Sequence, residues 1–413
     1  MGISTDRTLR QQFIFFTIIF MLTGLFVSRA LLSISMVLFL AFCFVHKDFS
    51  IQLRAFIRHP LLVGISLLFF IPLLTWFWSE DKETWWRFVR IKLPLFFFPL
   101  AFAGPWQLST KQWKWIAWFF LWLVFAGCCW SLWQYAPNMK AIHDAYLKAK
   151  VIPTPFENDH VRFSLVVCMA LLCSLYLIVK NAGRIARTVL IFLSVFFAVF
   201  LHILSARTGL LSLYLILFLG AAYLILTSAK VKWIMLFGIL AIVMPVASWF
   251  LAPTFQNRIR YFIYDLSYIR QETYLPGAND GNRMLSIKAG WDILNRHPFG
   301  TGSGDVMKAT HAWYDEHIHG MLDSDKIYPS SEWLMYGAAA GWPGLILFTV
   351  VMCIPFLYMP RSGSFFWISL NAITAFSFIF DIGLEVQFGI FIYVFMVLWW
   401  WKWFNASEEK PLP

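Results

Sequence analysis

The sequence predicts an all-α protein that crosses a membrane many times and carries one large loop on the outer side. Hydrophobic residues make up 60% of the 413 positions and charged residues only 13%, which is too apolar for a soluble chain of this length. The apolar residues fall into long runs, and Lys and Arg recur in the short loops of one side. These three observations together define the fold class.

The apolar runs predict about twelve membrane helices, because a span needs about 17 to 22 apolar residues. The run 93–107 is the weakest, since it is short and contains Pro94, Pro99 and Pro105. The predicted spans are 11–27, 30–46, 61–78, 93–107, 115–135, 162–179, 188–204, 208–228, 231–251, 331–358, 364–380 and 387–404.

The positive charges predict the orientation of these spans. With the N-terminus inside, each predicted inner loop carries Lys or Arg, so both termini are expected in the cytoplasm. The outer loop 79–92 departs from this rule and needs another explanation for its charge. Its basic residues are Lys82, Arg87, Arg90 and Lys92.

The sequence predicts a single membrane domain, residues 1–413. The loop between the ninth and tenth spans, residues 252–330, is expected to form a small helical cap on it. Within it, Ile287, Trp291 and Leu294 recur at helical spacing, which predicts a short amphipathic helix. The sequence HPFGTGSGD follows. No strand precedes it, so a flexible turn is expected rather than a phosphate-binding loop.

Arginines gather on the predicted outer face. Arg207, in LHILSARTGLLSLYL, could by itself be a charge that reaches out to the interface. However, Arg162, Arg283, Arg87 and Arg90 are predicted on the same face, and paired guanidinium groups suit a diphosphate. The net charge of +11 therefore favours an anionic lipid-linked ligand over nucleic acid.

Two further features have a structural and a functional interpretation. The stretch HAWYDEHIHGMLDSD is rich in His and Asp but lacks the spacing of a metal site, so a solvated loop and no metal are expected. Glu332, in KIYPSSEWLMYG, fits the first turn of a helix, where a carboxylate is stabilised by the helix dipole. An ionisable group this close to lipid is also a candidate functional residue.

Three segments, taken in order, resemble the O-antigen ligase family of bacterial inner-membrane glycosyltransferases, which includes O-antigen polymerases and protein O-oligosaccharyltransferases. They are SARTGLL at 205–211, NRMLSIKAGWDILNRHPFGTGSGD at 282–305 and YPSSEWLMYGAAAGWPGLILF at 328–348. The resemblance implies an enzyme that needs no metal or cofactor. It would move a glycan from undecaprenyl diphosphate to a hydroxyl acceptor at the periplasmic face, with Arg207 and Arg283 binding the diphosphate.

One departure from the family pattern affects the mechanism. The family's catalytic His and its following Asn fall on Ser330 and Ser331 here. Either Glu332 or His319 replaces that His, or stabilisation of the diphosphate is sufficient, or the chain is inactive.

The resemblance leaves the acceptor open. A lipid A–core acceptor is favoured, and repeat-unit polymerisation and protein O-glycosylation are the alternatives. A transporter of lipid-linked glycans is the rival from another class, and it would need charges deep along an internal path.

Overall fold

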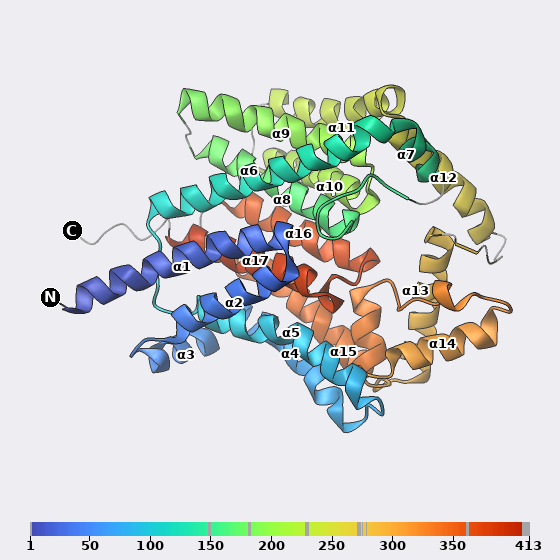
Figure 1. Cartoon of the computed structure of the whole chain (residues 1–413), viewed down its shortest axis with the longest axis horizontal. Helices are drawn as coiled ribbons and strands as arrows, with labels where there is room; N and C mark the ends of the chain where they lie inside the picture. The colour runs from blue at the N-terminus through green and yellow to red at the C-terminus, as the bar shows by residue number, and fades with distance from the viewer. Residues whose placement is uncertain are drawn as a thin grey trace.

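The computed structural model describes residues 2–147, 150–180, 183–227, 231–270, 274, 276–277, 279–360 and 363–406. All regular elements within these ranges are helices, most of which run side by side in a bundle (Figure 1). The two chain termini lie at one end of the bundle, and α13 and α14 lie at the opposite end, which we call the cap end (Figure 1).

The helices before the cap segment are α1 (Gly2–Val27), α2 (Arg29–Phe44), α3 (Phe49–Arg58), α4 (Pro60–Leu74), α5 (Lys82–Phe102), α6 (Thr110–Tyr135), α7 (Met139–Tyr146), α8 (His160–Val179), α9 (Arg184–Leu204), α10 (Arg207–Leu226) and α11 (Val231–Leu251). The remaining helices are α12 (Pro253–Arg270), α13 (Asn279–Arg296), α14 (Val306–His317), α15 (Glu332–Leu357), α16 (Ser364–Phe380) and α17 (Gln387–Ala406). Short 3-10 turns are η1 (Thr75–Phe77), η2 (Ala136–Asn138), η3 (Asp323–Asp325) and η4 (Gly383–Glu385).

The prediction of an all-α polytopic membrane protein is confirmed. Among the described residues, 9 helices are long and apolar enough to cross a membrane. The other three predicted spans lie on α2, on α5 and on α16. The helix α2 continues into α3 after a bend of 107°, α5 carries several charges in its first half, and α16 has 17 residues.

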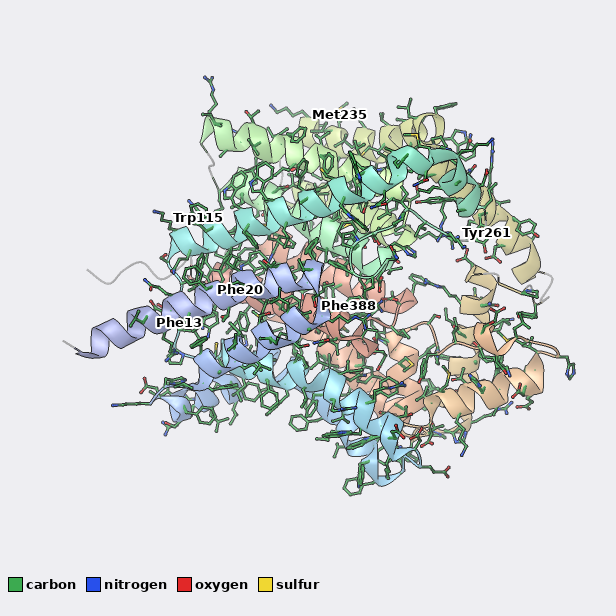
Figure 2. The ribbon with its side chains drawn as sticks, viewed as in Figure 1. Phe13, Phe20, Trp115, Met235, Tyr261 and Phe388 are labelled. Atoms are coloured by element: carbon green, nitrogen blue, oxygen red, sulfur yellow. The ribbon has the colours of Figure 1, made fainter. Side chains whose placement is uncertain are left out.

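Large apolar side chains cover the outside of the bundle, as expected for a surface in contact with lipid. Phe13 and Phe20 on α1, Trp115 on α6 and Met235 on α11 lie on this outer surface (Figure 2). Each of them is at least 49% exposed. By contrast, α8 and α17 are largely buried and form the centre of the bundle.

The helix α15 is broken in its middle, and the turn that follows α13 closes the break. Gly341 has φ 69 and ψ −161, and Pro343 has no N–H to donate to the carbonyl of Ala339. The freed carbonyl oxygens of Ala338 and Ala339 accept the backbone N–H groups of Thr301 at 2.8 Å and Gly302 at 3.0 Å. The helix break thus costs few hydrogen bonds, because another segment supplies the donors.

Two expectations for this region were wrong in detail. The glycine-rich turn is not free, because a Cβ at Gly300 or Gly302 would overlap the backbone of α15 or the side chain of Ser79. In α13, Trp291 is 51% exposed. Leu294 is buried as predicted, and Gly290, which has no side chain, lets α13 lie directly against Pro329 and Leu334 at the start of α15.

We expect Gly341→Ala to destabilise the protein. A Cβ at this position would overlap the carbonyl oxygen of Pro298, and residues other than glycine rarely adopt this backbone conformation. The cost is expected to be about 1–3 kcal/mol or more. The midpoint of thermal unfolding in detergent measures it, with Gly238→Ala as the control, since a Cβ at Gly238 meets no atom within 4 Å. Equal midpoints for the two variants would contradict this account of the break.

Candidate functional site

Several charged side chains from separate helices converge on one short segment at the cap end. We call residues 381–385, which connect α16 to α17, the junction segment. It includes the turn η4 and two carboxylates, Asp381 and Glu385. Helices α5, α8 and α15 each supply a charged side chain that binds it.

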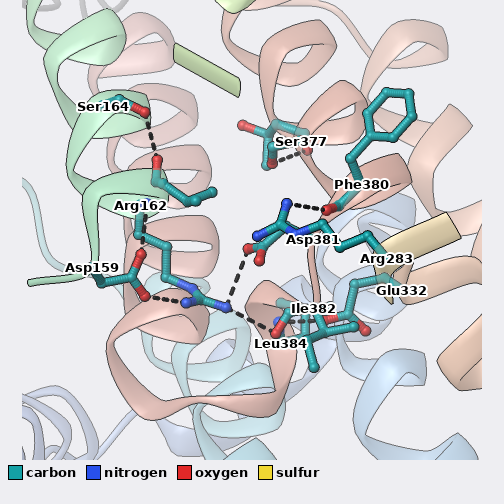
Figure 3. Close-up of polar contacts among 12 residues, drawn as sticks. Asp159, Arg162, Ser164, Arg283, Glu332, Ser377, Phe380, Asp381, Ile382 and Leu384 are labelled. Atoms are coloured by element: carbon teal, nitrogen blue, oxygen red, sulfur yellow. Dashed lines mark hydrogen bonds and ion pairs between the residues drawn. The ribbon is translucent and has the colours of Figure 1, made fainter. Parts of the chain in front are cut away.

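Arg162, at the start of α8, holds one end of the junction segment (Figure 3). Its Nη2 lies 3.1 Å from an oxygen of Asp381 and donates to the carbonyl of Ile382 at 3.0 Å. Its Nη1 forms an ion pair with Asp159, which also caps α8. Burial raises the pKa of the Asp381 carboxyl, although the positive charge of Arg162 opposes the shift.

Lys92 and Glu332 hold the other end of the segment. Lys92 Nζ lies 2.6 Å from Glu385 Oε1, and both side chains are buried. The Oε1 atom of Glu332 accepts the backbone N–H of Leu384 (Figure 3). Lys92 therefore pairs with Glu385, while Glu332 binds a backbone N–H of the segment, and burial raises the pKa of Glu385.

A second group of arginines lies at the start of α10, in α12 and at the start of α13. Arg207 forms an ion pair with Asp280, and its guanidinium lies 4.9 Å from the centre of the Phe262 ring. Arg258 is only 7% exposed, and it is near enough to Arg207 and Arg283 for their charges to act on it. Arg283 donates to the carbonyl of Phe380, beside the junction segment (Figure 3).

In this second group, buried donors lack partners, and so do buried oxygens of Asp265, Asp280 and Asn282. Buried N–H groups at Arg207 Nη2, Arg258 Nε and Arg258 Nη1 have no hydrogen-bond acceptor among the described residues. Burial, together with the charge of Arg207, lowers the pKa of Arg258 to about 10, while Asp280 opposes the shift. Buried charges without partners are costly, so this arrangement is suited to receive an anion.

A left-handed turn fixes the start of α8 beside these arginines. Phe156, Glu157 and Asn158 have φ of 65, 58 and 68, a conformation that costs roughly 1–2 kcal/mol per residue that is not glycine. Phe156 is buried against Phe26, with ring centres 5.0 Å apart. Glu157 pairs with Arg29 at 2.5 Å. These contacts hold the strained turn in place.

The structure separates some residues that the sequence grouped. Arg162 and Arg283 lie beside the junction segment and Arg207 pairs with Asp280, whereas Arg87 and Arg90 lie on α5, near the Glu385 side. His319 is exposed in the turn after α14, and no described contact joins it to Glu332 or to the arginines. The proposed roles of all these residues stay predictions.

Sequence reasoning missed four residues of the site: Arg258, Asp381, Glu385 and His160. His160 starts α8 and is near enough to Arg258, Asp159 and Arg283 to interact with their charges. The sequence contained a signal for Asp381 and Glu385, because both carboxylates lie between two predicted spans, next to apolar runs. The described part of the chain contains no group of three His, Cys, Asp or Glu side chains able to hold a metal ion.

Fold and site together define a multi-pass membrane protein with clustered arginines and carboxylates at one end of its helical bundle. Residues 192–349 match the family model described as O-antigen ligase. This part of the chain is therefore similar to the O-antigen ligase family, which confirms the resemblance over these residues. It contains Arg207, Arg258, Arg283 and Glu332, whereas the junction segment lies outside it. A comparison with curated proteins gives no match.

The geometry supports an anchoring role for Glu332. Its side chain is fully buried, and one of its oxygens is bound to Leu384. Ser330, at the position of the family's His, is also engaged, because its N–H donates to Ser286 Oγ at 3.1 Å. We therefore propose that Glu332 positions the junction segment and does not meet the acceptor.

We expect Glu332→Gln to keep its fold and to lose less than about tenfold in turnover, because the Gln carbonyl still accepts the Leu384 N–H. Glu332→Ala removes the acceptor and should lower both the thermal midpoint and turnover, since a buried N–H is left unpaired. Thermal unfolding and a glycan-transfer assay on both variants provide the test. A loss of about 100-fold in Glu332→Gln with unchanged stability would instead identify Glu332 as the general base.

Proposed function

We propose that this protein transfers a glycan from undecaprenyl diphosphate to a hydroxyl acceptor at the outer face of the membrane. The observation that carries this proposal is the set of buried, unpaired N–H groups on Arg207 and Arg258. Arg283 adds a third guanidinium to the group. The family match over residues 192–349 supports the same class of reaction.

A diphosphate is the anion that suits this group. Three neighbouring guanidinium groups, of which Arg258 is buried, repel one another, and a ligand with several negative oxygens relieves that repulsion. Guanidinium groups bind phosphate through paired, charge-assisted hydrogen bonds. Asp280 balances part of the charge through its ion pair with Arg207, which leaves Arg258 to bind the ligand.

The chemistry requires little more than this site and one proton acceptor. The acceptor oxygen forms a bond to the anomeric carbon as the bond from that carbon to the diphosphate oxygen breaks. The diphosphate leaves with the electron pair, and the acceptor's hydroxyl proton passes to a base. Arginines that face the leaving oxygen stabilise the charge that develops there, which is the main electrostatic contribution of such a site.

The proposal also concerns the identity of the acceptor. A lipid A–core acceptor is favoured, and a growing glycan or a protein hydroxyl would use the same donor site. A transporter would need charges along a path through the bundle. The charged groups that define this site instead lie at the ends of helices, at the start of α10, in α12 and at the start of α13, where Arg283 lies beside the junction segment (Figure 3).

We expect Arg207→Ala, Arg258→Ala and Arg283→Ala each to lower donor turnover at least about tenfold, because each removes a charge-assisted contact of roughly 1.5–3 kcal/mol. The matched Lys variants should recover activity only in part, since an ammonium group lacks the planar fork. Turnover of lipid-linked glycan, measured by mass spectrometry of the product, is the readout.

Arg296→Ala is the control for loss of an arginine in the cap. Arg296 is exposed and pairs with Asp292 and Glu316, so its removal should leave turnover unchanged. Full activity in all three site variants at normal membrane levels would contradict the proposed diphosphate site.

We further propose that His160 accepts the proton of the acceptor hydroxyl. It is half-buried, it lies near the charges of Arg258 and Arg283, and imidazole is the most common general base. His160→Gln should therefore lower kcat about 100-fold and leave the KM for the donor within a few-fold. His319→Ala, in the exposed turn, should remain near wild type. The opposite result would place the base in the cap loop.

A further inference from the structure

The short helix α3 is turned across the direction of the helix before it. It has 10 residues and follows α2 after a bend of 107°. A helix of this length is about 15 Å long, roughly half the thickness of the hydrocarbon core, so α3 cannot span a membrane. Figure 1 shows α3 toward the end of the bundle that holds the two chain termini, which the charge pattern predicts to be cytoplasmic.

Two buried side chains fix the rotation of α3 about its own axis. Gln52 is fully buried, and its Nε2 donates to the carbonyl of Leu100, in the last turn of α5, at 2.6 Å. Phe56 is 9% exposed, and its ring centre lies 6.4 Å from that of Phe96 on α5. Because Gln52 and Phe56 are one turn apart, one side of α3 is fixed on α5 and the other sides face outward.

The outward sides of α3 carry an apolar row and a basic row. Phe49, Leu53 and Ile57 recur every four residues and are 44%, 40% and 63% exposed. Arg54 and Arg58 are also exposed and lie one turn apart. At about 100° per residue, the apolar row lies between the side bound to α5 and the row of arginines. An apolar side next to a cationic side is typical of a helix that lies in the membrane interface.

The two arginines of α3 have no carboxylate partner on the protein. Among the described residues, no Asp or Glu forms an ion pair with either of them. The acid nearest to them in the sequence is Asp48, directly before α3. By contrast, Lys92, Arg162 and Arg207 at the other end of the bundle each pair with a carboxylate. Unpaired guanidinium groups beside an apolar row are suited to bind the phosphate of a lipid.

We propose that α3 lies in the plane of the membrane interface and binds an anionic phospholipid, with the phosphate at Arg54 and Arg58 and the acyl chains along Phe49, Leu53 and Ile57. A lipid with a net negative charge is required, because the cation of a zwitterionic headgroup offsets the charge of its phosphate. This site lies away from the arginines of the cap end and does not depend on the proposed glycan transfer.

The test is binding of phosphatidylglycerol to the purified full-length protein in detergent, titrated by native mass spectrometry, with phosphatidylcholine as the zwitterionic probe. The variant R54Q/R58Q should weaken binding of phosphatidylglycerol at least about tenfold and leave binding of phosphatidylcholine unchanged. The variant R54K/R58K should stay within about threefold of wild type, because it keeps both charges. Both variants should keep the wild-type thermal midpoint in lipid-free detergent, since these side chains are exposed.

Two further variants separate the apolar row from the charge. Leu53→Ser combined with Ile57→Ser changes no charge and should weaken binding of both lipids, because the acyl chains lose apolar contacts. The matched control is R184Q/R187Q, which removes two exposed arginines at the start of α9, on the same predicted side of the membrane. This control should bind phosphatidylglycerol within about twofold of wild type.

Four results would overturn the proposal. Unchanged affinity for phosphatidylglycerol in R54Q/R58Q would mean that these arginines bind no lipid. An equal loss in R184Q/R187Q would mean that binding follows total charge and not α3. Equal affinity of the wild type for the two lipids would mean that α3 contacts bulk lipid only. Unchanged binding in the double Ser variant would mean that the acyl chains do not lie along α3.

Discussion

The closure of the break in α15 is the interaction on which the rest of the structure depends. Gly341 and Pro343 interrupt the helix inside the membrane domain, where an unpaired carbonyl is costly. The turn after α13 supplies the missing donors, and the N–H of Trp342 donates to the carbonyl of Pro298 at 2.9 Å. The cap segment is therefore part of the membrane helix's hydrogen bonding, and α13 cannot move independently of α15.

The closed break also fixes the positions of site residues on α13 and α15. Because α13 is fixed on α15, Arg283 faces the end of α16, and Asp280 can pair with Arg207 at the start of α10. The start of α15 carries Glu332, which binds the junction segment. The break in α15 thus aligns the ends of α10, α13 and α16 in one place, and a rigid site is suited to stabilising charge in a transition state.

Burial determines which charges are structural and which are available to ligands. The Lys92–Glu385 and Arg162–Asp381 pairs join opposite charges that are largely buried, so they serve the fold of the junction segment. Arg258 is buried without a complete set of acceptors, and its free N–H groups are what an anion would bind.

The sequence by itself determined the membrane class, the approximate spans, the cap segment and the position of Arg207 and Arg283 on one face. These follow from local periodicity and charge, which depend on residues close together in the chain. Only the tertiary structure decided that the glycine-rich turn is packed, that Trp291 is exposed and that Arg258 joins the site. Burial and pairing depend on residues far apart in the chain, as in the contact of Lys92 with Glu385 across a separation of 293 positions. No local pattern encodes such a contact, because it exists only once the helix ends are packed together.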